Sequence, residues 1–358
     1  MATKQRAIGM WLLFMAAAVL VQVGIGGITR LTDSGLSITE WKPLLGVVPP
    51  LDEAAWAESF DKYKQLPQYV QLKSHLTLEE FKGIYFWEWF HRLWGRMLGV
   101  FFALPFLYFW RTRALTGLGP KLVLLFVLGG LQGVLGWFMV MSGLAQLVYV
   151  SHLRLAAHYL LALLLFSALL WIAAPLVWPT RQVQAPALRR ATWVLLGGLV
   201  VQLAWGAFMA GLKAALMAPT WPTINGAWVP VSLWSESPWN HPLSVHFIHR
   251  TLALVLLGAV GAWWWATRAK LGLERHLVLG LSWAQVLLGI FTLLNAPYAG
   301  RLLWFGLLHQ LVGSMLVGAV VVALVNLKPQ LQSENSRPSA LMRGEPLELR
   351  VTEKPPTG

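Results

Sequence analysis

Four histidines lie inside long apolar segments of this chain, at His91, His158, His249 and His309. An ionisable side chain is rare inside a membrane span, because its charge is costly to bury in hydrocarbon, and such residues usually have a function. For any one of them, the alternative is a neutral histidine that hydrogen-bonds a neighbouring helix. All four are placed at a similar depth in the outer half of the membrane, two in each half of the chain. This recurrence favours a shared chemical role.

Paired imidazoles suit haem iron better than a small metal ion. Zinc prefers three or four ligands, and copper or non-haem iron needs three ligands close together. The chain has no cysteine and offers only two such histidines per half. A porphyrin supplies four nitrogens, so the protein adds two axial ligands. We predict two haem sites, His91 with His158 and His249 with His309. Arginines beside these ligands could pair with haem propionates: Arg92, Arg96 and Arg250.

The two halves differ one helical turn before the first ligand of each pair. Glu88 precedes His91, whereas His246 holds the matching position before His249. Residues three apart share a helix face, so we expect Glu88 to face the same pocket as His91. There a carboxylate could take a proton or stabilise developing positive charge. The alternative is a structural ion pair with Arg92. The difference suggests that one haem is modified and the other carries electrons, while the role of His246 stays open.

Composition places these residues in a polytopic, all-α membrane protein. Hydrophobic residues make up 57% of the 358 residues and charged residues 12%, with a mean hydropathy of +0.58. A soluble domain has about 25% charged residues. Crossing a bilayer takes about 20 mainly apolar residues in helical form, and no strand-like alternation indicates a barrel. We predict eight spans at 8–29, 85–110, 119–141, 150–177, 190–212, 244–267, 273–294 and 301–327.

Basic residues predict the orientation of the spans. Lysines and arginines gather before the first span and in alternate connections, all on one side, whereas the charges of the first loop on the other side nearly cancel. By the positive-inside rule, both termini are cytoplasmic. Much of the net charge of +13 is therefore a topology signal, and no nucleic-acid partner is expected. The first span lacks a small-residue cleavage site, and no Arg- and Ser-rich presequence precedes it, which favours a retained helix in a bacterial inner membrane.

A short motif repeats in the odd-numbered spans, where Gln is followed four residues later by Gly. The simplest interpretation is helix packing, in which a small residue permits close approach and a buried amide bonds across the interface. The recurrence predicts two pseudo-symmetric four-helix bundles: residues 1–178 with the substrate-haem site and 190–327 with the second haem, joined by a cytoplasmic linker at 179–189 and followed by a disordered tail at 328–358. The motif occurs as Gln22–Gly26, Gln132–Gly136, Gln202–Gly206 and Gln285–Gly289.

Two long strings resemble the haem A synthase family: GGITRLTDSGLSITEWKP at residues 26–43 and IYFWEWFHRLWGR at 84–96. Shorter matches are RLAAH at 154–158, His249-Arg250 and His309-Gln310. The resemblance covers about residues 8–327. The first-half strings are long and specific, whereas the second-half matches are short.

This resemblance implies an enzyme that converts the C8 methyl group of haem O into the formyl group of haem A, by successive hydroxylations and loss of water from a gem-diol. It implies that His91 and His158 flank the substrate haem, with Glu88 as the catalytic carboxylate. It also implies that His249 and His309 ligate a haem b cofactor. The implied partners are haem O, the lipid bilayer, an unidentified electron acceptor and, as a candidate, haem O synthase.

Two departures and two alternatives accompany this interpretation. Some family members carry a cysteine pair in the first outer loop, and its absence here excludes a thiol-based step. Lys213 stands where other members have an acidic residue, which leaves the role of the second outer loop open.

The main alternative is a di-haem cytochrome that takes electrons from quinol, which would not need Glu88. A haem or lipid transporter is the second alternative, and we expect no span to contain the interior proline break typical of that class.

Overall fold

The fold was analysed in a computed structural model, which describes residues 2–41, 45–145, 148–178, 183–233 and 235–328. Eight helices in this part of the chain are long and apolar enough to cross a membrane, and they confirm the eight predicted spans and the all-α membrane class. They are α1 (Ala2–Leu31), α3 (Leu78–Arg111), α4 (Gly119–Ala145), α5 (His152–Val177), α6 (Pro186–Gly211), α8 (Pro242–Ala266), α9 (Leu273–Leu294) and α10 (Ala299–Asn326).

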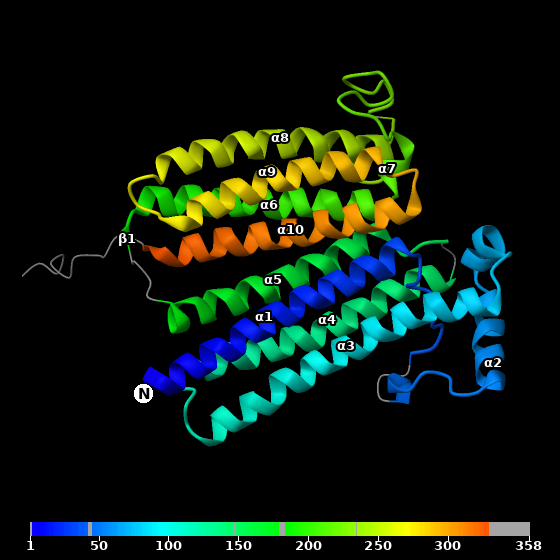
Figure 1. Cartoon of the computed structure of the whole chain (residues 1–358), viewed down its shortest axis with the longest axis horizontal. Coiled ribbons are helices and arrows are strands. Elements are labelled where there is room, and N and C mark those ends of the chain that lie inside the picture. The colour runs from blue at the N-terminus through cyan, green and yellow to red at the C-terminus, as the bar shows by residue number, and fades with distance from the viewer. Residues whose placement is uncertain (1, 42–44, 146–147, 179–182, 234, 329–358) are drawn as a thin grey trace, which may run out of the picture.

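The spans lie in two neighbouring groups of four (Figure 1). In the first group, α1 packs against α3 and α5, and α4 packs against α3 and α5. In the second, α6 packs against α8 and α10, and α9 packs against α8 and α10. The groups meet where α10 contacts α1 and α5, and where α5 contacts α6. A two-fold relation between the halves remains a prediction.

The two ends of the molecule carry different elements (Figure 1). One end of the molecule carries the N-terminus, the α3–α4 turn and the α8–α9 turn. The segments at this end are the ones in which the sequence has its clusters of basic residues. At this end β1 (Val183–Gln184) pairs in parallel with β2 (Leu327–Lys328). Both β1 and the start of α6 at Pro186 fall within the predicted linker. Beyond residue 328, the predicted disordered tail lies outside the described residues.

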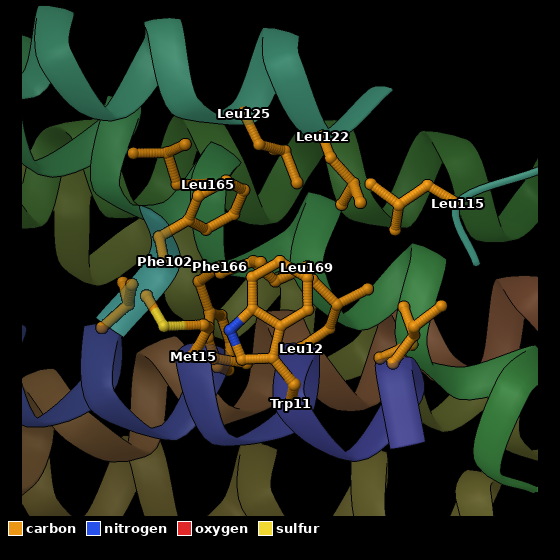
Figure 2. Close-up of a cluster of buried hydrophobic side chains, with 14 residues drawn as sticks. Trp11, Leu12, Met15, Phe102, Leu115, Leu122, Leu125, Leu165, Phe166 and Leu169 are labelled. Atoms are coloured by element: carbon orange, nitrogen blue, oxygen red, sulfur yellow. The ribbon is translucent and has the colours of Figure 1, made fainter. Parts of the chain in front are cut away.

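Close-packed apolar clusters fill the inner part of each group, at the end where the N-terminus lies. The first cluster joins side chains of α1, α3, α4 and α5 around Trp11, Phe102 and Phe166 (Figure 2). A second cluster joins α6, α8, α9 and α10 around Trp263 and Val320. Neither cluster contains any of the four intramembrane histidines. The histidines therefore lie toward the opposite end, outside the densest packing.

The first outer loop is partly helical, which the sequence analysis did not predict. It contains η1 (Leu45–Val47), α2 (Glu53–Lys64) and η2 (Tyr69–Lys73). Tyr63 and Phe81 are fully buried in a small apolar core between this loop and the start of α3. α3 begins at Leu78, before the predicted 85, because a capping box between Thr77 and Glu80 satisfies its first backbone N–H groups. In the second outer loop, α7 (Ala214–Met217) follows α6.

Two of the spans contain an interior proline, but neither helix is interrupted at it. Pro105 lies inside α3, and Pro175 lies inside α5. Both helices continue past the ring, so neither span is broken into two half-helices. The unwound segments that mark many alternating-access sites are not present at these two positions.

Candidate functional site

Each of the four histidines packs against the glycine of one Gln-x-x-x-Gly motif on a neighbouring helix. A Cβ atom built on each glycine would lie 3.0–3.1 Å from Cε1 of the facing imidazole, which is closer than nearly all real Cβ contacts. A side chain at any of these positions would therefore displace the ring. The pairs are Gly26 with His91, Gly136 with His158, Gly206 with His249, and Gly289 with His309.

The glutamines of the same motifs bond the same histidines. In three pairs the amide nitrogen donates to the histidine backbone carbonyl, over 2.9–3.1 Å. In the fourth, Nδ1 of His309 donates to the backbone carbonyl of Gln285 over 3.0 Å. In the sequence, the glutamines and the histidines form two separate patterns, whereas in the structure they contact one another. The three amide-to-carbonyl pairs are Gln22 with His91, Gln132 with His158, and Gln202 with His249.

The second-half histidines have the spacing of two ligands on one metal. The ring centroids of His249 and His309 are 6.3 Å apart, with an interplanar angle of 80°. A metal–imidazole bond of about 2.0–2.1 Å puts a ring centroid roughly 3 Å from the metal, so two rings on opposite sides are roughly 6 Å apart. All four histidine side chains keep some accessible surface. The glycine contacts and this spacing fit a flat macrocycle between the two rings.

The first-half histidines are held by the equivalent helices. His91 lies on α3 against α1, and His158 lies on α5 against α4, within a ring of four helices in which each contacts its two neighbours. In the described part of the chain, no group of three or more His, Cys, Asp or Glu side chains is placed to hold a metal ion. Two imidazoles with a porphyrin are therefore a better match to these side chains than a bare ion is.

Glu88 is buried and bonded on both oxygens. Its Oε2 accepts from the Ser37 hydroxyl and from the Ile38 backbone N–H, each over 2.8 Å. Its Oε1 accepts from the Arg92 guanidinium over 2.6 Å. The structural ion pair considered in the sequence analysis is thus present. Ser37 lies in one of the family-like strings, but no sequence pattern indicates its contact with Glu88.

The arginines next to the ligands are engaged with loop backbone. Arg92 also donates to the carbonyls of Ile38 and Glu40 over 3.0 and 3.1 Å. In the second half, Arg250 donates to the Thr220 carbonyl over 3.2 Å and lies over the ring of Trp221. These contacts hold the outer loops above each helix group, and the predicted propionate contacts stay a prediction. His246 is buried, and its Nδ1 has no hydrogen-bond partner.

An ion pair joins the outer loops of the two halves. Lys213 donates to Asp33 over 2.8 Å and to the Tyr149 hydroxyl over 3.1 Å. Asp33 also pairs with Arg30 over 3.3 Å. Nearby, burial lowers the pKa of Lys73, with a smaller opposing effect of Asp33 and a further lowering by Lys213. Lys213, which the sequence analysis left without a role, therefore stabilises the contact between the halves.

One sizeable cavity lies away from these residues. Its volume is about 610 Å³, and Trp110, Arg113 and Pro120 line it at the α3–α4 turn. Trp110 and His91 are separated by about 28 Å along α3 at 1.5 Å per residue. The cavity belongs to the opposite end of the bundle and takes no part in the histidine sites.

Comparison with known proteins identifies the family. The model of a family described as "Cytochrome oxidase assembly protein" matches residues 9–321. The chain belongs to this family. The match covers six of the membrane helices fully and most of α1 and α10, and it includes Glu88 and the four intramembrane histidines.

Curated relatives in this family are similar along most of their length. A "Heme A synthase" of Rhodospirillum centenum is 46% identical over 343 residues, covering 92% of this chain and 90% of the relative. One of Parvibaculum lavamentivorans is 44% identical, covering 85% and 92%. One of Sphingopyxis alaskensis is 42% identical, covering 90% and 92%. The resemblance stated from the sequence is thereby confirmed.

Proposed function

We propose that this chain is a haem A synthase, which oxidises the C8 methyl group of haem O to the formyl group of haem A. The observation that carries the proposal is the fourfold Gln–Gly–His contact, two per helix group, with a buried carboxylate beside one group and none beside the other among the described residues. The relatives named Heme A synthase support the same function. The di-haem electron-transfer cytochrome finds no support among these names.

In this proposal the two helix groups bind different haems. His91 and His158 hold the substrate, haem O, in the first group. His249 and His309 are the axial ligands of haem b in the second group, and their 6.3 Å ring separation supports this role. Haem b, when bound there, supplies a one-electron relay. The assignment of 1–178 and 190–327 to these two sites belongs to the proposal.

Glu88 is the residue that handles protons in this scheme. It lies three residues before His91, and on a helix this places both on one face. Three donors hold its carboxylate in one position, from Ser37, Ile38 and Arg92. A carboxylate fixed in this way can accept a proton from the substrate side, and the adjacent guanidinium neutralises its charge before the proton arrives. Preorganisation of this kind is how enzymes favour a charged transition state.

The cellular setting follows from the spans and the relatives. The chain is a multi-pass membrane protein. We place it in a bacterial inner membrane with both termini in the cytoplasm, because its basic residues gather at the end of the N-terminus. Haem O then enters from the bilayer, and haem O synthase is a candidate donor. The electron acceptor stays unidentified.

Pigment analysis tests the proposed reaction. The protein is expressed together with a haem O synthase in cells that lack haem A, and the extracted haems are separated and weighed by mass spectrometry. The proposal predicts haem A or its hydroxylated precursor, whose mass exceeds that of haem O by one oxygen. Cells that contain the folded protein and haem O but neither product would contradict it.

A further inference from the structure

The four glutamines present an unexplained feature at the histidine sites. The side-chain oxygen Oε1 of each one is buried and has no hydrogen-bond partner. Buried acceptors are nearly always bonded, because leaving one unpaired destabilises the folded protein. The same unpaired oxygen at four equivalent positions indicates a common role for the four glutamines. The four are Gln22, Gln132, Gln202 and Gln285.

Each orphan oxygen belongs to a side chain that contacts a histidine. At the first-half site on α5, Nδ1 of His158 is also buried and without a partner, while the Gln132 amide lies at the same residue's backbone carbonyl. At two other sites the Gln amide nitrogen lies next to Nδ1, at 3.2 Å for Gln22 with His91 and 3.1 Å for Gln202 with His249. An unpaired acceptor therefore lies one side-chain rotation away from an imidazole nitrogen.

A histidine that binds a metal would provide a hydrogen-bond donor for the unpaired glutamine oxygen. A histidine that binds iron through Nε2 carries its proton on Nδ1, and such a ligand almost always donates that proton to an oxygen. His309 already has this arrangement, because its Nδ1 donates to the Gln285 carbonyl over 3.0 Å. The Gln285 amide nitrogen lies 3.4 Å from Nε2 of the same ring, the nitrogen that would bind iron.

We propose that the Gln-x-x-x-Gly motifs are positioning elements for the haem ligands, an inference that rests on the proposed haem sites. The glycine leaves the space into which the imidazole turns, and the glutamine orients the ring. With Nε2 as the iron ligand, Oε1 of Gln22, Gln132 and Gln202 would accept a hydrogen bond from Nδ1–H, as the Gln285 carbonyl does for His309. The motif thus sets the tautomer of the ligand and increases the electron density that it donates to the iron.

The test uses the purified full-length protein and the second-half site, since its cofactor stays bound. Gln202→Leu removes the acceptor at similar volume, and Gln202→Glu replaces it with a stronger one. The measured quantities are the haem b content, the low-spin absorption spectrum and the reduction potential. We expect Gln202→Leu to weaken haem b binding about 10–100-fold, the usual effect of losing such a partner, and to raise the potential of the remaining haem. Gln202→Glu should lower that potential.

Matched glycine variants keep the test decisive if Gln202→Leu does not fold. Gly206→Ala puts a Cβ 3.1 Å from Cε1 of His249, whereas an added Cβ at Gly197 on the same helix meets nothing within 4 Å. We expect Gly206→Ala to perturb the haem spectrum and Gly197→Ala to leave it unchanged. If Gln202→Leu and Gly206→Ala both keep the wild-type haem content, spectrum and potential, the positioning role is overturned. Haem A formation by the wild type is measured separately, so failure of the enzyme function would be recognised independently.

Discussion

Oε1 of Glu88 lies 2.6 Å from the guanidinium of Arg92, one helical turn further along α3. Both side chains also bond the loop that follows α1, Glu88 through Ser37 and Ile38, and Arg92 through the carbonyls of Ile38 and Glu40. The candidate catalytic carboxylate and the outer loop are thus parts of one hydrogen-bonded unit. Changes in the loop should consequently affect chemistry in the bundle.

Substitution of Glu88 by Gln should block turnover and leave haem b bound. The amide has nearly the same size but carries no negative charge, and it replaces one of the two carboxylate oxygens by an NH₂ group that cannot accept a proton. Loss of a positioned acid or base usually costs about 10²–10⁴-fold in rate. The measurement is haem A yield per mole of purified protein. Glu79→Gln, which removes an exposed carboxylate paired with Lys82 on the same helix, is the control. An unchanged yield in Glu88→Gln would exclude the assigned role.

Substitution of Ser37 by Ala should weaken catalysis by a smaller amount. It removes one of three donors to the carboxylate, and a hydrogen bond to a charged group contributes about 1.5–3 kcal/mol. If that stabilisation is needed in the transition state, haem A formation falls roughly 10–100-fold while haem b content stays constant. The exposed Ser74 provides the control substitution. Full activity in Ser37→Ala would mean that the loop does not position Glu88.

Alanine substitutions in the two histidine pairs should have different effects on haem b binding. His249→Ala or His309→Ala should lose haem b, because each removes one of two axial ligands. His91→Ala should retain haem b and lose only substrate conversion. Haem content is read from the absorption spectrum of the purified protein, with His75→Ala in the exposed outer loop as a control. Equal loss of haem b from the His91 and His249 variants would refute the assignment of separate sites.

The ion pair between Asp33 and Lys213 should stabilise the contact between the two halves modestly. Both side chains are mostly but not fully buried, with 21% and 27% of their surface exposed. A pair of this kind contributes about 1 kcal/mol at most. A double-mutant cycle with Asp33→Ala and Lys213→Ala, followed by thermal unfolding in detergent, measures the coupling. Lys213→Glu should lower the unfolding temperature further, and combining it with Asp33→Lys should recover part of the loss. Strict additivity would show that the pair is energetically neutral.

The absence of cysteine makes the orientation directly measurable. A single cysteine introduced as Lys64→Cys, on the exposed surface of the outer loop, should react with a membrane-impermeant maleimide in spheroplasts. Arg113→Cys, in the exposed α3–α4 turn, should react only after the membrane is opened. The wild type gives the background. The reverse pattern would place both termini outside the cytoplasm.

The spans could be predicted from the sequence, because a helix is the only way to satisfy the backbone of a single apolar segment in a bilayer. The bounds of α9, at 273–294, match the prediction, and the other spans differ mainly at their ends. The largest difference is the start of α3, which extends into the aqueous loop, where hydrophobicity no longer marks a helix. The small core around Tyr63 and Phe81 was missed for the same reason.

The residues of the candidate site could be proposed from the sequence, but the contacts among them could not. Repetition alone identified the glutamines and the histidines, because the same spacing recurs in each half. The contacts between particular glutamines and histidines depend on how each helix is rotated about its axis. The sequence does not specify this rotation directly. Lys213 and Asp33 lie in loops that are far apart in the sequence, so no local sequence pattern predicts their ion pair. The three donors around Glu88 likewise require the loop after α1 to fold back over α3.

Extraction and mass analysis of the haems bound to the purified protein test the central claim most directly. The protein is prepared from cells that supply haem O, in the wild type and in the His91→Ala and His249→Ala variants. The account predicts haem b together with haem O, a hydroxylated intermediate or haem A in the wild type, with only haem b left in His91→Ala and haem b missing from His249→Ala. A wild-type protein that is folded but contains no haem, or whose haem b depends on His91 and not on His249, would contradict it.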